Sequence, residues 1–213
     1  MDRLSFLVLA CLVSICIGSV SYAATATSTN RLCKLAKSGF YLGAAVGASD
    51  TNYKKSAFDN PNTGAVIANG VVDNSGFGYR GLVGYKFNKN FATELGYTKF
   101  DRTKGRGLNY SGGPLNQTGS IDEQAVDLTA KGILPVVNKI SLYAKLGAAY
   151  LFSRTKVNNI FTKNRSGVRP WLGAGISFDV TKNFAFDASY NRIESTGKIK
   201  TPEFLGIGFY WYL

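Results

Sequence analysis

The chain contains no histidine, and it has only 13 acidic residues against 25 lysines and arginines, for a formal net charge of +12. Histidine is the side chain most often used for proton transfer near neutral pH, so its absence removes most catalytic mechanisms. The excess of positive charge points to an acidic partner. We therefore expect a protein that is not an enzyme, needs no cofactor and meets something anionic.

The N-terminus has the pattern of a cleaved secretory signal peptide. Residues 4–20 form an apolar run after Arg3, and residues 21–23 (SYA) supply the small-x-small triplet that signal peptidase needs. We expect residues 1–23 to be removed. A retained N-terminal helix is a weaker alternative because the run is short. Lipoprotein cleavage before Cys11 is also weaker, because Leu9 is bulky for a lipobox.

Cysteine is scarce: Cys11 and Cys16 lie in the leader, and Cys33 alone remains in the mature chain. No disulfide framework is then possible within one chain. Because an exported chain does not meet nucleic acid, its positive charge favours lipopolysaccharide phosphates, anionic outer-membrane lipids or acidic glycans as partners.

A run of about 18 apolar residues, long enough for a transmembrane helix, is also missing after residue 37. Instead, apolar side chains recur at every second position, opposite small or charged ones, which is the pattern of β-strands. Eight segments show this alternation: 40–46, 77–86, 91–98, 126–134, 142–150, 172–178, 184–190 and 205–213.

The connections alternate as regularly as the strands. Short turns at 88–90, 135–138 and 181–183 are interspersed with long polar stretches at roughly 49–75, 101–120, 153–167 and 194–202. This arrangement predicts an all-β fold, an eight-stranded antiparallel up-and-down transmembrane β-barrel over residues 38–213. Residues 24–37 are then a short periplasmic segment, and the location is the bacterial outer membrane.

A water-soluble barrel also alternates, but it would carry dense charge outside and apolar side chains inside. Here the polar face holds sparse charges of both signs among glycines, which suits a narrow interior, so the bulky face must meet lipid. Aromatic residues near the strand ends indicate two interfacial girdles. One contains Phe40, Tyr85, Phe87, Phe91, Phe178, Phe184 and Trp211, and the other contains Phe77, Tyr97 and Tyr150.

Three stretches carry a family resemblance. Residues 84–97 (GYKFNKNFATELGY) and 142–147 (LYAKLG) resemble strands of the OmpA-like transmembrane barrels. Residues 205–213 resemble the C-terminal signal that the outer-membrane assembly machinery binds, with Phe209, Trp211 and Leu213 at alternate positions, although such signals usually end in phenylalanine. The resemblance implies fold and compartment rather than activity. We expect no peptidoglycan-binding domain after the barrel.

Some eight-stranded outer-membrane barrels modify lipid A and resemble catalysts that use a histidine beside a serine or an acid. That mechanism cannot operate without histidine. The segment at 173–175 (GAG) might suggest a phosphate-binding loop, but it lies within a strand and no helix follows it. We expect its small residues to relieve crowding inside the barrel.

The third long connection is rich in cations and contains no acid between residues 153 and 169. A mobile cationic loop can bind sulfated or phosphorylated host glycans or matrix proteins. It can equally contact the phosphates of the cell's own lipopolysaccharide. The candidate residues are Arg154, Lys156, Lys163, Arg165 and Arg169.

Strand parity places three cations and three anions inside the barrel: Arg80, Lys131, Lys145, Glu94, Asp127 and Asp187. In OmpA-like barrels the acid matching Glu94 pairs with a cation on strand seven, but the matching position here is Asp187. We therefore expect either that the acids take up a proton or that another cation bridges them, with Lys145 at the centre and Asp127 as its partner. Lys145 then lies opposite Thr129 or Lys131, and only the first register brings Asp127 within reach. Separately hydrated charges are the alternative.

These observations favour a structural surface protein, a monomeric barrel whose loops serve adhesion or recognition. The alternative is a narrow channel for small solutes or ions. Eight strands leave an interior just wide enough for side chains, which favours the first function.

Overall fold

The computed structural model describes residues 39–60, 62–158, 160–194 and 201–213. The expected leader, the segment 24–37 and Cys33 lie outside these residues, so the expectations about them stay predictions. In the described part of the chain, no helix has the length and apolar character needed to cross a membrane.

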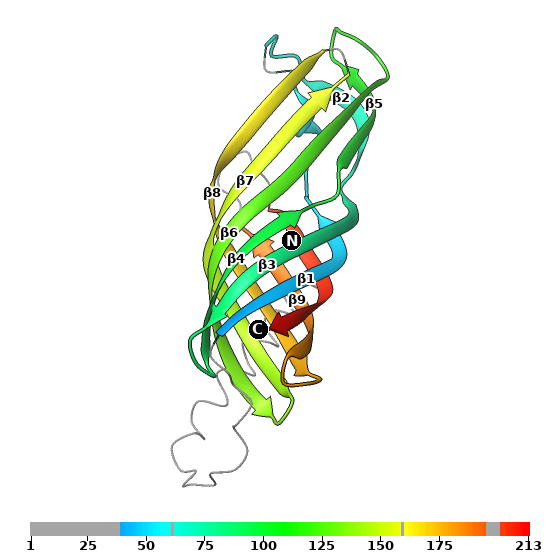
Figure 1. Cartoon of the computed structure of the whole chain (residues 1–213). Helices are drawn as coiled ribbons and strands as arrows, with labels where there is room; N and C mark the ends of the chain where they lie inside the picture. The colour runs from blue at the N-terminus through cyan, green and yellow to red at the C-terminus, as the bar shows by residue number, and fades with distance from the viewer. Residues whose placement is uncertain (1–38, 61, 159, 195–200) are drawn as a thin grey trace, which may run out of the picture. The chain divides into compact units, whose positions relative to one another are not determined.

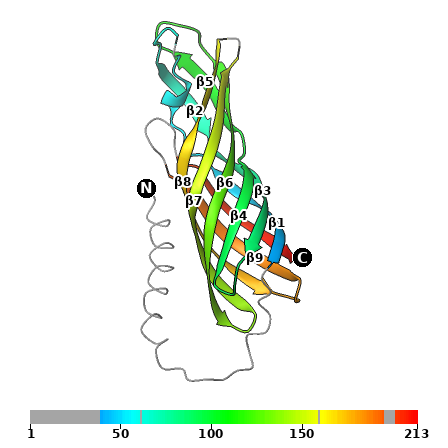
Figure 2. The ribbon, with the colours of Figure 1, turned by 60° about the vertical axis from the view of Figure 1, so that its left-hand side comes forward.

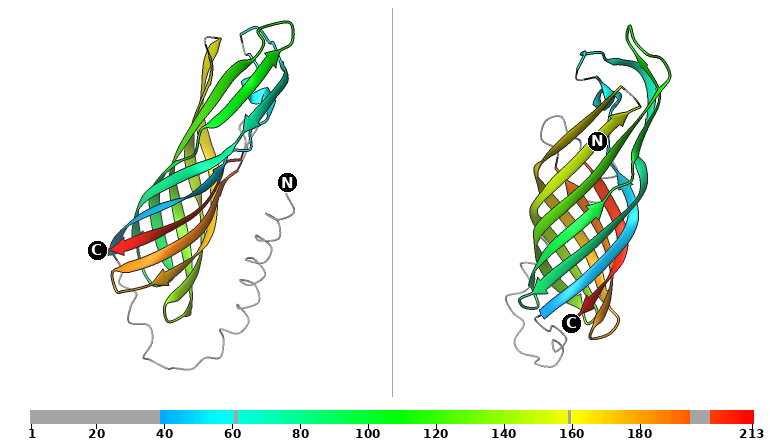
Figure 3. Two further views of the ribbon diagram at one scale, coloured as in Figure 1. Left: turned by 90° about the vertical axis from the view of Figure 1, so that its right-hand side faces the viewer. Right: turned by 45° about the horizontal axis from the view of Figure 1, so that its top comes forward.

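Eight antiparallel strands close into a ring (Figures 1 and 3). Its order is β6, β4, β3, β1, β10, β9, β8, β7 and back to β6, so the first and last strands of the chain are neighbours. The strand bounds are Gly39–Asp50 for β1, Ser75–Lys86 for β3, Phe91–Lys99 for β4, Gln117–Val137 for β6, Ile140–Val157 for β7, Phe161–Asp179 for β8, Phe184–Ile193 for β9 and Glu203–Tyr212 for β10. The predicted eight-stranded up-and-down barrel is confirmed.

Each strand turns large apolar side chains outward and smaller or charged ones inward. Leu128 and Ile207 are 61% and 69% exposed on the outer face, whereas the inward-facing Thr129 is buried. Glycine is needed at some inward positions, because a Cβ at Gly84 would lie 2.2 Å from the ring of Tyr41. An outer surface this apolar is suited to contact with lipid.

Aromatic side chains mark two heights on the outer face. Near the short turns, Phe40 packs edge-on against Tyr85, with ring centroids 4.9 Å apart. At the other end, Tyr150 packs against Phe152 at 4.7 Å, and Tyr97 lies on the neighbouring wall. We call Tyr97, Tyr150 and Phe152 the far girdle, and we take the membrane-spanning part of the strands to lie between the two heights.

Beyond the far girdle two of the long connections, 101–120 and 153–167, are largely β-structure and 49–75 contains a further strand, so the expectation of loops was wrong there. β7 and β8 continue as a hairpin, and residues 153–167 lie mostly within its strands (Figure 2). Two further strands, β2 (Ile67–Asp73) and β5 (Thr103–Tyr110), join the end of β6. The sequence hid these strands because outside the membrane an outward face is polar, which weakens the alternation signal.

We call this region the strand extension: β2, β5 and the ends of β6, β7 and β8 beyond the far girdle. A small apolar core lies on its inner face, where Phe58 of the short helix η2 (Lys55–Phe58) is fully buried. The core consists of Tyr53, Phe58, Leu108, Tyr110, Ile121, Val157 and Phe161. The extension is therefore a folded structure with its own packing rather than a set of mobile loops.

Candidate functional site

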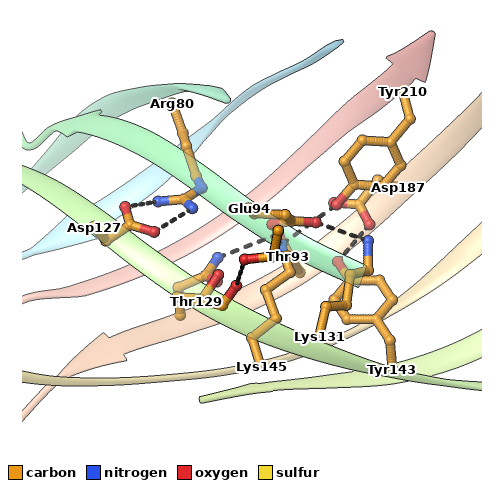
Figure 4. Close-up of polar contacts among 12 residues, drawn as sticks. Arg80, Thr93, Glu94, Asp127, Thr129, Lys131, Tyr143, Lys145, Asp187 and Tyr210 are labelled. Atoms are coloured by element: carbon orange, nitrogen blue, oxygen red, sulfur yellow. Dashed lines mark hydrogen bonds and ion pairs between the residues drawn. The ribbon is translucent and has the colours of Figure 1, made fainter. Parts of the chain in front are cut away.

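Glu94 is the centre of a charged layer inside the barrel (Figure 4). Its Oε1 accepts a hydrogen bond from Tyr41 Oη at 2.9 Å and lies 3.0 Å from Lys131 Nζ. Its Oε2 lies 2.7 Å from Lys145 Nζ. Lys131 and Lys145 are direct cross-strand partners on β6 and β7. One carboxylate thus bridges two buried lysines and offsets the repulsion between them.

A second ion pair lies closer to the far girdle. Arg80 on β3 donates from Nη1 and Nη2 to the two carboxylate oxygens of Asp127 on β6, at 2.6 and 2.8 Å. Its Nη1 also donates to Thr98 Oγ1 at 2.8 Å, and its guanidinium lies 4.6 Å from the ring centroid of Trp171. Both charges are almost completely buried, and the two-point geometry fixes their orientation.

Tyrosines complete the charged layer. Asp187 on β9 accepts a hydrogen bond from Tyr143 Oη. Lys131 Nζ lies 4.1 Å from the ring centroids of both Tyr143 and Tyr210. Sequence reasoning missed the tyrosines, although their inward parity among small residues was visible. They supply the hydrogen bonds and ring faces that the six charges alone do not.

The expected pair between Lys145 and Asp127 is not formed. The hairpin register places Lys145 opposite Lys131 rather than Thr129. Lys145 therefore pairs with Glu94, and Asp127 pairs with Arg80. The register follows from an irregularity between Pro135 and Val137 beside the short turn, which the sequence alone did not specify.

The charged layer lies between two apolar layers. Toward the short turns it adjoins Leu82, Ala92 and Ala185, which pack with the rings of Tyr41 and Tyr210. Toward the far girdle it adjoins a larger apolar cluster of Ala45, Phe100, Ala125, Ala149, Leu151, Trp171, Ile193 and Phe204. A cavity of about 10 Å³ beside Arg80, Lys145 and Asp187 has room for about one water molecule. The described residues form no cluster of three or more His, Cys, Asp or Glu side chains that could hold a metal ion.

A separate polar contact joins Tyr53, in the segment after β1, to the inner wall at the far-girdle end of the barrel. Tyr53 Oη donates to the buried carboxylate of Glu123, and it lies 3.2 Å from Ser153 Oγ. The other carboxylate oxygen of Glu123 has no hydrogen-bond partner among the described residues. Burial raises the pKa of Glu123 to about 7, although its hydrogen bonds and the charge of Lys99 act in the opposite direction. Sequence reasoning missed this group.

The five candidate cations are divided between two faces of the strand extension. Arg154 and Lys156 on β7 are exposed on its outer face. The other three lie on β8 at inward positions and are half-buried: Lys163, Arg165 and Arg169. The expected single mobile cluster is therefore wrong in its arrangement, because alternate residues of a strand point to opposite faces.

The proposed assembly signal lies on the last strand, which pairs with β1 and β9. Phe209, Trp211 and Leu213 are exposed on its outer face. Tyr210 between them points inward and is buried. Their binding by the assembly machinery stays a prediction.

Known proteins share this architecture. The family model of the OmpA-like transmembrane domain matches residues 35–206. Outer membrane protein A of Serratia marcescens is 28% identical over 170 residues, which cover 76% of this chain and 44% of that protein. A Coxiella burnetii protein, described as uncharacterized, is 26% identical over 200 residues, covering 78% and 79% of the two chains. The chain thus matches less than half of the S. marcescens relative.

Among solved structures, the outer membrane protein OprG from Pseudomonas aeruginosa has a similar fold. The TM-score is 0.56 at 13% sequence identity, and the alignment covers 83% of this chain and 98% of that one. At this identity the similarity concerns the fold alone.

Proposed function

The chain belongs to the OmpA-like transmembrane domain family, and we propose that it is a structural protein whose extracellular part recognises anionic partners. It is a β-barrel of the bacterial outer membrane. Short turns of such barrels face the periplasm and long connections face outward, so the strand extension is extracellular. The proposed mechanism is binding, without turnover or transport.

The packed barrel interior carries this proposal. Ion pairs fill the middle of the interior, with apolar layers above and below, and the cavity beside them has room for about one water molecule. Conduction would require these layers to separate, whereas a structural role uses them as they are. The runner-up function, a narrow channel for small solutes or ions, has no comparable support in this geometry.

The extracellular cations support the recognition part of the proposal. Four of the candidate cations lie within the paired strands of the β7–β8 hairpin, on its two faces: Arg154, Lys156, Lys163 and Arg165. Cations held on a strand are preorganised, so less side-chain and loop entropy is lost on binding than with a mobile loop. Sulfated or phosphorylated host glycans and matrix proteins are the proposed partners.

Binding to immobilised heparin tests the recognition role. We expect the purified barrel to be retained and to elute with salt, and a variant with Arg154, Lys156, Lys163 and Arg165 changed to glutamine to elute at clearly lower salt. A matched control changes Lys89, Lys139 and Lys182, which are exposed cations at the periplasmic turns. Equal loss in both variants, or no retention of the wild type, would contradict the proposal.

Several expectations about assembly belong to the same proposal. We propose that residues 1–23 are the cleaved signal, that residues 24–37 lie in the periplasm and that residues 38–213 fold as one monomeric barrel domain. We also propose that Phe209, Trp211 and Leu213 bind the assembly machinery.

A further inference from the structure

The outward face of the strand extension becomes cationic directly beyond the far girdle. Along β7, the outward positions after Phe152 are Arg154 and Lys156. Along β4, Lys99 follows Tyr97 at the next outward position. On β5, the exposed side chains of the same face are also basic, Arg102 just before the strand and Lys104 and Arg106 within it. The lipid-facing surface is thus continued by a basic one.

The strand register brings these cations close together, and the acidic side chains beside them are too few to balance their charge. Ser120 on β6 has Lys104 as its partner on one side and Lys156 on the other. Two strand spacings separate these lysines by about 10 Å at the backbone, so both long side chains can reach an anion above Ser120. In the described chain, neither lysine has an acidic side chain within ion-pair distance.

The next outward residue of β6 after Ser120 is Asp122, a single acid that has several cations around it. Asp122 Oδ1 lies 2.8 Å from Arg102 Nε and 3.9 Å from Lys99 Nζ. Arg154 is the cross-strand partner of Asp122, yet no ion pair joins them. The face as a whole holds six cations against the two acids Asp73 and Asp122: Lys99, Arg102, Lys104, Arg106, Arg154 and Lys156. We call these six residues the outer-face patch.

The opposite wall of the barrel is different. Its outward charges at the extracellular end of β1, β9 and β10 are Asp50, Arg192 and Glu203. Arg192 Nε lies 2.9 Å from Glu194, and Arg192 Nη1 lies 3.4 Å from Glu203. The cation of that wall is therefore neutralised within the chain. Of these two walls, the outward positive charge that lacks acidic partners among the described residues therefore lies on the one from β4 to β7.

We propose that the outer-face patch binds the phosphorylated headgroup of lipopolysaccharide in the protein's own membrane, with Lys104, Arg154 and Lys156 as the central contacts. This inference rests on the proposed function, since it names a partner for part of the extracellular cations. The position of the patch along the barrel favours a lipid as the partner. The patch directly follows the far girdle and faces sideways, where lipid headgroups surround the barrel. A host glycan would have to displace those headgroups to reach it, whereas the inward-facing Arg165 and Arg169 do not face this lipid layer.

Lipid A carrying its two phosphates, and lipid A with the same acyl chains but no phosphate, provide the test. Each is titrated into the barrel in phosphatidylcholine nanodiscs without divalent cations, with affinity measured by fluorescence. We expect at least about tenfold preference of the wild type for the phosphorylated form, since each surface cation adds several-fold to such attraction. Changing Lys104, Arg154 and Lys156 to glutamine should bring the ratio close to one.

Two further variants make the test specific. The matched control, Arg165→Gln with Arg169→Gln, should keep the wild-type ratio. Ser120→Glu places a carboxylate between Lys104 and Lys156, so it should lower the ratio without removing any cation. A shift in gel mobility between unboiled and boiled samples, equal to that of the wild type, verifies that each variant is folded.

Two results overturn the inference: a wild-type ratio near one, or a wild-type ratio retained in both patch variants. If heparin retention still depends on the extracellular cations in that case, the proposed function stands and only the lipopolysaccharide assignment fails. Conversely, phosphate preference without any heparin retention would support the patch and contradict the host-directed function.

Discussion

Charges inside the barrel and charges on the strand extension are arranged in opposite ways. Inside, Glu94 forms ion pairs with two lysines, and Asp127 pairs with Arg80. On the extension, Lys104 and Lys156 are left without acidic partners. An enclosed charge is costly unless it is paired, while an exposed cation remains hydrated. The comparison separates charges that stabilise the fold from charges that are available for a ligand.

Removing the central interior acid should have the largest effect. In Glu94→Gln, Lys131 and Lys145 face each other without a neutralising carboxylate, so we expect the free energy of unfolding to fall by about 3 kcal/mol. Urea unfolding in phospholipid vesicles, followed by tryptophan fluorescence, measures this. The matched control is Glu203→Gln, which removes a partly exposed acid and should cost less than about 1 kcal/mol. Equal losses would remove the distinction between paired interior and surface charges.

A double-mutant cycle sharpens the assignment of interior partners. Arg80→Ala and Asp127→Ala together should lose about 1 to 3 kcal/mol less than the sum of the single losses, because they remove the same ion pair. Lys145→Ala with Asp127→Ala should be additive to within about 0.5 kcal/mol, since Lys145 pairs with Glu94. The reverse result would show that the register assigned to the β6–β7 hairpin is incorrect.

Glu123 is an exception to the rule that interior charges are paired. It is buried and yet has no cation within ion-pair distance in the described chain. Tyr53 and Ser153 face it, with Lys99 as the nearest positive influence. Its pKa is raised from 4.5 to about 7 by burial. The contact between Glu123 and Tyr53 therefore contributes most to stability below pH 4.5, and this contribution is lost as the pH rises through about 7.

Hydrogen exchange of residues 51–58 at pH 5 and pH 8, corrected for intrinsic rates, measures this loss. We expect protection at pH 5 to exceed that at pH 8 by on the order of 1 kcal/mol, less than the full pKa shift implies, because the barrel mouth can admit water. Glu123→Gln cannot ionise, so it should abolish the difference. If the variant keeps the wild-type pH dependence, Glu123 is not its cause.

Much of the barrel could be predicted from the sequence, because lipid imposes a strict period of two. Phe91, Leu95 and Tyr97 face outward and Glu94 faces inward, as alternation requires. The same parity identified the six charges of the charged layer. It could not identify their partners, since pairing across strands depends on register, and a shift of two residues preserves every face while exchanging the neighbours.

The strand extension was harder to predict because its outer face meets water and headgroups rather than acyl chains. Arg154 and Lys156 alternate with the buried Thr155 and Val157, but the cations made the segment resemble a loop. Lys104 and Glu123 were missed for a related reason. Their roles depend on β5 and on Tyr53, which reach β6 through contacts distant in sequence.

Ion conductance tests the closed interior most directly. Purified wild-type protein is reconstituted in planar lipid bilayers, and single-channel currents are recorded alongside Glu94→Gln as the variant most expected to loosen the charged layer. If the packed layers persist in the membrane, the wild type shows no sustained conductance steps, because buried ion pairs and apolar side chains fill the middle of the barrel. Sustained, large conductance steps from the wild type would contradict the closed barrel and favour the channel function.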